Sequence, residues 1–386
     1  MPSYKTPGVY VEEVNSGAKP IEAVGTSTAG FVGISPNNQA FVNQVKAINN
    51  WTQFISLFCD DGTISTELST AVYGFFQNGG SRCYVVNIGE SGSLISKGIK
   101  RGGVDLFETV DEVAIVAAPG FTKAEDYEAL LSHCEKMGDR VAILDAPLEI
   151  EELDNLTKIA KPSDAKAGAR ARQSDRGYGA FYFPWIKVSD PLNGELIEIP
   201  PSGHMAGVYA RTDATRGVHK APANDNIRGA LDTTYAVTDS EQSILNPAGV
   251  NCIRFFQTEG VRIWGARTLA PEASDWRYLN VRRLFNMVEE SIVKSTRWVV
   301  FEPNDDSLWK GIVRDVSAFL KILWMDGALM GSSPEEAFYV KCDEETNPPE
   351  MINSGIVVTE IGIAPVKPAE FVVFKIGQHE SGTEKN

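Results

Sequence analysis

The sequence has few of the residues that form disulfides, metal sites and histidine-based active sites. It contains five cysteines and four histidines among 386 residues, and no two cysteines have C-x-x-C spacing. An odd number of scattered cysteines favours buried free thiols in a reducing compartment over a disulfide framework. No pair of histidines or cysteines has metal-ligand spacing. We therefore expect no bound metal and no other cofactor.

Positive charge is also scarce. Lysine and arginine total 36 against 51 aspartates and glutamates, which gives a formal net charge of -15 at pH 7. A general nucleic-acid-binding protein needs excess cationic side chains to displace the counterions of the phosphates. An acidic surface favours solubility and repels anionic membranes. Nucleic acid is therefore excluded as an expected partner.

Long hydrophobic runs are missing as well. No apolar run approaches the ~18 residues of a membrane-spanning helix, and the first residues lack the hydrophobic region of a signal peptide. We expect a chain that is made in the cytoplasm and does not insert into a membrane. The apolar fraction of 43% is nevertheless typical of a folded protein, and the length suggests two or more packed subdomains.

The first half of the chain alternates between strand and helix patterns. Such a β-α-β alternation predicts an α/β domain with a mostly parallel sheet. The expected strands are 29–34, 83–88, 113–118, 141–144 and 180–183, and the expected helices are 66–77, 122–137 and 149–160.

The strongest periodic pattern covers residues 246–331. Alternating apolar residues on both sides of a turn at 258–260 predict a β-hairpin. Two long amphipathic helices are expected to follow, at 275–297 with Ser274 or Asp275 as N-cap, and at 307–329 after Asp305. No catalytic group stands out in this stretch.

Strand patterns occur near both ends of the chain, at 9–14 and at 370–376. The first is followed by a linker at 15–20. A strand set off in this way has two interpretations, which the residues alone leave open. It forms the edge of its own sheet, or it adds to the sheet of another subunit.

An enzyme is the alternative function. Parallel sheets bind ligands in the loops that follow their strands, which here points to Pro119 and Asp145. However, the loop at 118–126 has neither GxxxxGK[ST] nor GxGxxG, and the sequence has no GxSxG. An α/β enzyme for a phosphorylated or acyl substrate remains the competing hypothesis.

Cations gather on the two long helices although the chain is acidic overall. These cations have two interpretations: they lie on solvated helix faces, or they form a surface that binds a charged partner. The residues concerned are Arg277, Arg282, Arg283, Lys294 and Arg297 on the first helix, and Lys310, Arg314 and Lys321 on the second.

Several segments resemble contractile tail sheath proteins. They are YKTPGVYVEE at 4–13, APAN at 221–224, NPAGVN at 246–251, VRIWGART at 261–268 and WRYLNVRRL at 276–284. The resemblance covers residues 1–35 and roughly 200–380. One departure is the residue before Asn224, which is alanine here and is often glycine in the family.

The resemblance implies a non-enzymatic subunit that stacks as hexameric rings around an inner tube and contracts to drive the tube through a target envelope. Its implied partners are further copies of the chain, the inner tail tube protein, and the baseplate and tail terminator proteins. The implied particle is a phage tail, a bacteriocin or a contractile injection system. Because the sequence specifies no nucleotide site, we expect contraction without ATP.

The resemblance also implies a division of the chain. An N-terminal strand arm and linker occupy 1–22, an outer α/β domain 23–200, a tube-facing core of mixed sheet and two long helices 201–364 (with a possible strand from 23–35), and a C-terminal strand arm and tail 365–386. The implied inter-subunit strand residues are Val9, Tyr10, Val11, Val14, Phe371, Val372, Val373 and Phe374. For Lys310, Arg314 and Lys321 we expect contact with an acidic tube surface, and plain solvation of the helix is the alternative.

Overall fold

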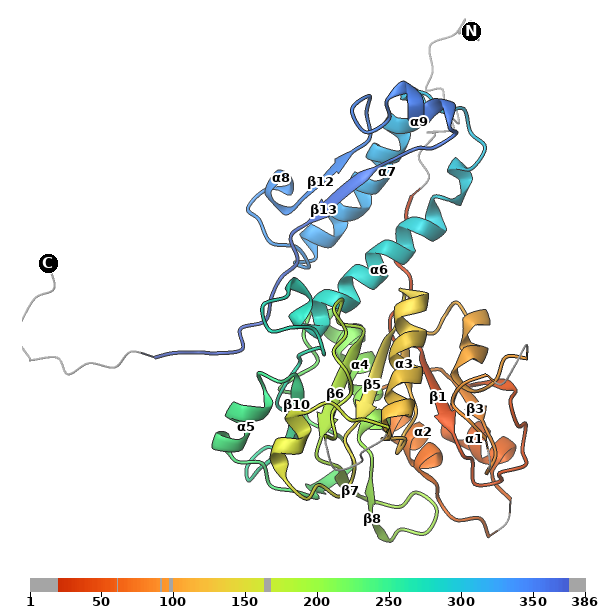
Figure 1. The fold of residues 1–386 in the computed structure, drawn as a ribbon, viewed down its shortest axis with the longest axis vertical. Coiled ribbons are helices and arrows are strands. Elements are labelled where there is room, and N and C mark those ends of the chain that lie inside the picture. Colours follow the sequence, from red (N-terminus) through yellow and green to blue (C-terminus); the bar gives the residue numbers. More distant parts are fainter. Residues whose placement is uncertain (1–19, 61, 91, 97–99, 163–167, 375–386) are drawn as a thin grey trace, which may run out of the picture.

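The computed structural model describes residues 20–374 apart from 61, 91, 97–99 and 163–167. The N-terminal strand expected at Val9, Tyr10, Val11 and Val14 lies outside the described residues. In the described part, a broad sheet with its covering helices forms one end of the molecule, and a smaller helical unit extends from it (Figure 1).

The broad sheet has eight strands in the order β11-β10-β6-β5-β4-β1-β3-β2. The inner pairs are parallel, whereas β2 with β3 and β10 with β11 pair antiparallel at the two edges. This confirms the expected mostly parallel sheet and the hairpin. The strands are β1 Ala29–Gly33, β2 Val45–Ile48, β3 Cys83–Asn87, β4 Ile115–Ala117, β5 Val141–Asp145, β6 Gly179–Phe183, β10 Val250–Phe256 and β11 Gly260–Ile263.

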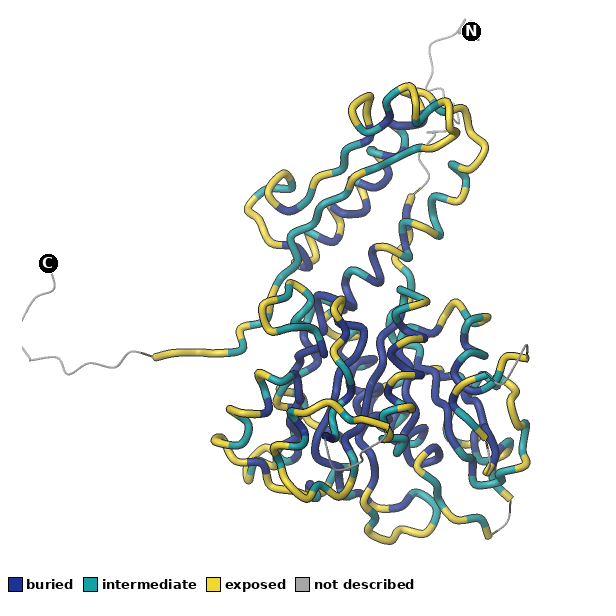
Figure 2. The backbone as a smooth tube through the Cα atoms, in the orientation of Figure 1, coloured by how far each residue is buried: buried dark blue, intermediate teal, exposed yellow. Residues whose placement is uncertain are grey.

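Helices cover both faces of this sheet because its strands are apolar on both sides. Ile115 and Ala117 join one hydrophobic cluster and Val116 joins the other, as the two-residue period of a strand requires. The first cluster includes α1 Trp51–Phe58, α2 Glu67–Gln77 and α4 Ser202–Arg216, and the second includes α3 Ala124–Met137. Figure 2 shows the buried backbone concentrated in these layers. We call this unit the sheet body.

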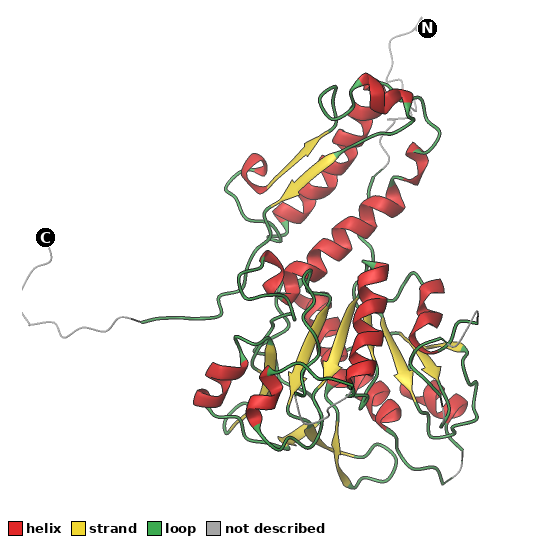
Figure 3. Cartoon of the chain, viewed as in Figure 1, coloured by secondary structure: helices red, strands yellow, loops and turns green. Residues whose placement is uncertain are grey.

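The second unit, which we call the helical body, is built on a third hydrophobic cluster. It contains the outer part of α6, all of α7 and a two-stranded antiparallel sheet, as Figure 3 shows. Asp305 accepts a hydrogen bond from the Leu308 amide and so caps α7, as expected. The elements are α6 Leu279–Ser295, α7 Asp306–Met325, α8 Pro334–Ala337, β12 Phe338–Lys341, α9 Pro349–Asn353 and β13 Glu360–Ile363.

Helix α6 joins the two bodies. Leu279, at its first turn, belongs to the first cluster of the sheet body, whereas Leu284, Met287 and Val288 belong to the cluster of the helical body. The hairpin β10–β11 and the two long helices therefore do not share one core, although they are consecutive in the sequence.

The remaining elements are small. A three-stranded antiparallel sheet has the order β8-β7-β9. Its strands are β7 Ile186–Ser189, β8 Leu196–Ile199 and β9 Ala230–Thr233; the short helices are η1 Gly103–Thr109, η2 Leu153–Thr157, α5 Asp239–Leu245, η3 Asp275–Arg277 and η4 Arg297–Val299.

Three local predictions were wrong. The helix expected at 149–160 is only the 3₁₀ helix η2, and its apolar residues Ile150, Leu153 and Leu156 repeat every three residues, which suits a 3₁₀ turn. Ser274 caps the 3₁₀ helix η3, so α6 begins later than expected, at Leu279. The described residues of the strand expected at 370–376 form no strand.

The broad sheet takes strands from both sides of the boundary expected between residues 200 and 201, because β10 lies beside β6. The division of the chain into domains stays a prediction. None of the helices in the described part of the chain combines the length and hydrophobicity that a bilayer crossing requires.

Candidate assembly surfaces

After β13, the chain runs back from the helical body to the sheet body. After β13, the Met330 amide donates to the Ala364 carbonyl over 2.8 Å, and the Val366 amide donates to Ala328 over 3.2 Å. The Asn280 side chain then donates to the Val366 carbonyl over 3.1 Å. Beyond this point lies a segment that we call the C-terminal arm, residues 367–374.

Glu370 fixes the root of the C-terminal arm to the sheet body. Its two carboxylate oxygens accept hydrogen bonds from the Nε and Nη2 atoms of Arg267, both over 2.9 Å. The Asn246 amide donates to the same carboxylate over 2.6 Å and the Tyr278 hydroxyl over 3.0 Å. A bidentate arginine–carboxylate pair with two further donors sets both position and direction.

The electrostatics keep this clamp charged. Arg267 is only 4% exposed, and the carboxylate of Glu370 is mostly covered. Burial alone would raise the pKa of Glu370, but the pairing with Arg267 and the hydrogen bond from Asn246 outweigh it and lower the pKa. The carboxylate is therefore ionised at neutral pH. No sequence motif predicts this clamp, although a single acidic residue directly before four apolar ones is a visible signal.

The four residues after the clamp are apolar and unprotected. Phe371, Val372, Val373 and Phe374 are 72%, 69%, 78% and 82% exposed. Figure 2 shows this segment extending away from the rest of the chain. Aromatic and β-branched residues are good strand formers, and a contiguous exposed apolar segment indicates an interaction site. The arm is thus suited to pair with another sheet.

The three cations expected on the second long helix lie along one exposed face of α7. Lys310 pairs with Asp306 over 2.6 Å with both side chains in solvent, and Arg314 contacts Asp315 over 2.9 Å. Lys321 is also exposed. Steps of four and seven residues return to nearly the same side of a helix. We call Lys310, Arg314 and Lys321 the basic stripe.

The cations expected on the first long helix include two that face inward. Arg282 is 1% exposed and lies over the Trp276 ring at 4.2 Å, and Arg283 is 3% exposed. Arg283 donates to both carboxylate oxygens of Asp213 over 2.9 and 2.6 Å. These two arginines belong to the interior, so the hypothesis of a partner surface was wrong for them.

The structure gives Asp145 a structural role. Its carboxylate accepts hydrogen bonds from the backbone amide of Ser202 over 2.8 Å, from the Ser202 hydroxyl over 2.7 Å and from the Gly120 amide over 3.4 Å. Burial raises its pKa to about 7. The side chain thus caps the first turn of α4 and ties it to the loop after Pro119, with both oxygens engaged.

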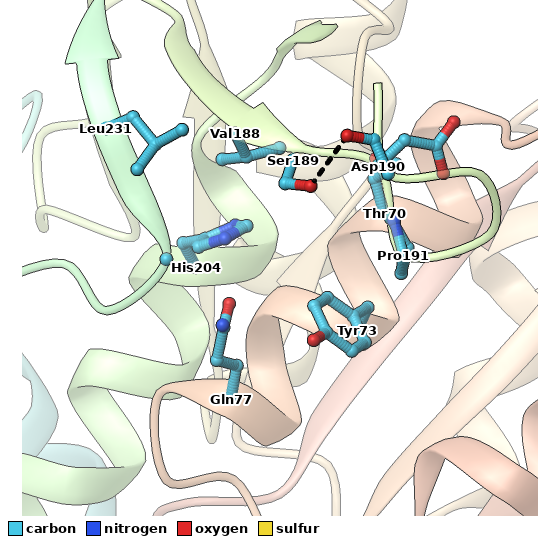
Figure 4. A pocket seen from close by; sticks show the side chains of 11 residues that line it. Thr70, Tyr73, Gln77, Val188, Ser189, Asp190, Pro191, His204 and Leu231 are labelled. Carbon is cyan, nitrogen blue, oxygen red and sulfur yellow. Dashed lines mark hydrogen bonds between the residues drawn. The ribbon is translucent and has the colours of Figure 1, made fainter. Parts of the chain in front are cut away.

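A hollow of about 440 Å³ lies between α2, α4 and the three-stranded sheet (Figure 4). Tyr73 and Gln77 from α2 and His204 from α4 border it. Burial lowers the pKa of His204 to about 4, so its ring is neutral, and the Ser189 hydroxyl donates to the Gly194 carbonyl and not to this ring. Among the described lining residues, no hydroxyl is paired with a histidine as a nucleophile would be.

Two family models match consecutive parts of the chain. The model of the phage tail sheath protein central domain matches residues 103–269, and the model of the phage tail sheath C-terminal domain matches residues 272–378. Together they cover the parallel sheet from β4 onward, both long helices and the root of the C-terminal arm.

Curated relatives agree with these models. A tail sheath protein of Salmonella phage ViI is 28% identical over 283 residues, which is 68% of this chain and 43% of the relative. A putative prophage major tail sheath protein of Pseudomonas aeruginosa (strain UCBPP-PA14) is 27% identical over 272 residues, 68% of this chain and 64% of the relative. The chain thus spans less than two thirds of both relatives in these matches.

Solved structures match over almost the whole length. The PVC sheath complex of an extracellular contractile injection system, in its contracted state, is 31% identical, with a TM-score of 0.79 over 98% of this chain and 99% of the other. The helical sheath of the anti-feeding prophage, also contracted, is 31% identical, with a TM-score of 0.77 over 98% and 100%. The chain belongs to the phage tail sheath family and is a structural subunit of a contractile sheath.

Proposed function

We propose that this chain polymerises as stacked hexameric rings around an inner tail tube, and that contraction of the stack drives the tube through a target envelope. The observation that carries the proposal is the C-terminal arm, which is clamped at Glu370 and then presents four exposed apolar residues. An extended segment of this kind completes a sheet in a second copy through backbone hydrogen bonds.

The strand predicted at Val9, Tyr10, Val11 and Val14, outside the described residues, is proposed to act in the same way at the other end of the chain. Backbone pairing depends little on side-chain detail, so such links can persist while the bodies of neighbouring subunits turn. The linker at 15–20 would supply the flexibility that this turning needs. Tail tube, baseplate and tail terminator proteins are the proposed further partners, within a phage tail or a phage-tail-like particle.

Contraction is proposed to need no ATP, with the energy stored in packing between subunits. The test is electron microscopy of the purified chain, and of tubes with sheath attached, in buffer treated with apyrase to remove nucleotides. Striated tubules that shorten and widen on a contraction trigger are the expected result. A dispersed monomer at all concentrations, or shortening that requires added ATP, would contradict the proposal.

The basic stripe is proposed to contact an acidic tube surface. Simultaneous Lys310→Glu, Arg314→Glu and Lys321→Glu replacement is expected to reduce sheath assembly on tubes about tenfold or more, because each stacked ring repeats the repulsion. Single exposed ion pairs contribute only ~0–1 kcal/mol each, which suits contacts that must release together. Co-sedimentation of sheath with tubes measures the effect.

The matched control reverses three exposed cations of the sheet body, Arg82, Lys123 and Lys158. This variant changes the net charge by the same amount and is expected to assemble on tubes normally. Equal assembly of both variants would show that the basic stripe only solvates α7.

A further inference from the structure

Two carboxylates and a buried histidine meet where the 3₁₀ helix η1 packs against α3. Asp105 and Glu108 come from η1 and His133 from α3. One ligand atom from each lies within 4.8 Å of the other two. No sequence motif predicts this cluster, because η1 and α3 are separate elements and the three residues have no motif spacing.

The histidine is the unusual member. Its side chain is only 1% exposed, and neither ring nitrogen has a hydrogen-bond partner among the described residues. Its Nδ1 atom points toward the Asp105 carboxylate at 4.0 Å, beyond hydrogen-bond distance. A buried polar atom without a partner is costly, so a ring with two such atoms calls for a ligand. Burial, followed by the nearby Arg140 charge, lowers the pKa of His133 to about 4, so the ring is neutral at pH 7.

The two carboxylates are held in place from behind. The second oxygen of Asp105 accepts a hydrogen bond from the Ser96 amide over 3.1 Å. Glu108 accepts from Lys136 over 2.6 Å and from Arg101 over 3.1 Å, which lowers its pKa and keeps it ionised. The Ser96 amide is an outer contact of the kind that orients metal ligands in known sites.

We propose that Asp105, Glu108 and His133 bind one divalent cation of the zinc type and so link η1 to α3. An imidazole nitrogen and two carboxylate oxygens are ligands that zinc accepts, with a fourth position left for water. A tetrahedral shell at ~2.0–2.2 Å per ligand separates its ligand atoms by roughly 3.4 Å. The carboxylates therefore close in by about 1 Å on binding, and both are partly exposed, which leaves them room to move.

Lys136 and Arg101, which pair with Glu108, would compete with a metal ion for the Glu108 carboxylate. Lys136 and Arg101 are 65% and 56% exposed, so both can turn into solvent when a metal ion arrives. A carboxylate has about four lone-pair sites, so Glu108 can also bind the ion and keep one of these partners. Removing one competitor is thus expected to strengthen binding, an effect opposite to that of removing a ligand.

The experiment titrates zinc chloride into the full chain, stripped with a chelator, by isothermal titration calorimetry. One zinc per chain is expected, with a rise in melting temperature of roughly 3–5 °C at a hundredfold excess over Kd. Asp105→Asn is expected to weaken binding 10- to 100-fold, and Lys136→Gln to tighten it several-fold. Magnesium, which prefers oxygen-only shells, is expected not to compete at equal concentration.

Asp111→Asn is the matched control, because Asp111 lies near η1, is 71% exposed and is outside the cluster. It is expected to bind zinc as the unaltered chain does. Less than about 0.2 zinc per chain, or equal affinity in Asp105→Asn and Asp111→Asn, would overturn the proposal. The first result would mean that the cluster does not bind zinc, and the second that zinc binds only to the general acidic surface.

Discussion

Asp213→Ala is expected to lower the free energy of unfolding by about 3–5 kcal/mol, because it leaves the Arg283 guanidinium buried without its counterion. Asp213 and Arg283 have side chains that are 6% and 3% exposed. The Thr26 hydroxyl donates to the same carboxylate over 2.5 Å, and Arg283 donates to the Thr26 carbonyl over 3.1 Å. One carboxylate thus holds α4, the start of α6 and the segment before β1 together.

The urea midpoint of the purified chain measures this loss. Asp239→Ala is the matched control, because Asp239 forms a comparable contact with Arg254 over 2.6 Å but is 93% exposed. An exposed pair contributes only ~0–1 kcal/mol. If both variants shifted the midpoint equally, the buried pair would not be the joint between α4 and α6. The double variant Asp213→Leu with Arg283→Met is expected to recover part of the loss, because neither charge is then buried alone.

Phe371→Asp combined with Phe374→Asp is expected to abolish sheath polymerisation and to leave the folded chain intact. The two rings are so exposed that they contribute little packing within one chain, so the melting temperature is expected to change by less than about 1 °C. In an added strand, however, residues 371 and 374 point to opposite faces, so whichever face packs on the neighbouring copy would receive an unpaired carboxylate, where charge is expensive.

Sedimentation of assembled sheath and the melting temperature of the dispersed chain separate the two effects. Phe371→Tyr with Phe374→Tyr is the matched control, since tyrosine keeps the strand preference and most of the apolar area. It is expected to polymerise. Normal polymerisation of the aspartate variant would remove the C-terminal arm from the assembly contacts.

Much of the fold could be predicted because its elements are strongly periodic. The parallel strands carry continuous apolar residues, and α7 has an unbroken apolar stripe with a capping Asp305. The hydrophobic pattern of each of these segments therefore indicates a single type of secondary structure. At 149–160 the pattern was ambiguous, since an apolar residue at every third position suits a 3₁₀ turn and a helix alike.

The contacts that position the candidate surfaces could not be predicted from the sequence. Glu370 pairs with Arg267 across 103 residues, and Arg283 with Asp213 across 70. A charged residue on a helix is on average a surface residue, so both interpretations of Arg282 and Arg283, a solvated helix face and a partner surface, place them at the surface. Only the fold shows that the Tyr178 and Trp276 rings cover Arg282. It also shows that Arg283 lies against Tyr209 and Asp213 of α4. Phe371, Val372, Val373 and Phe374 are exposed because no element of their own chain lies beside them, and their pairing with a neighbouring subunit stays a prediction.

Helix α6 also has a mechanical consequence. Its 17 residues make it ~25 Å long, with its first turn in the core of the sheet body and its later turns in the core of the helical body. If the helical body turns relative to the sheet body, this helix would act as a lever, with Arg283 and Asp213 near its fixed end. A tilt of about 10° at the base carries the far end through roughly 4 Å, close to the spacing between two paired strands. A small rotation at this buried ion pair would therefore displace the far end of α6, and the helical body around it, by several ångströms relative to a neighbouring subunit.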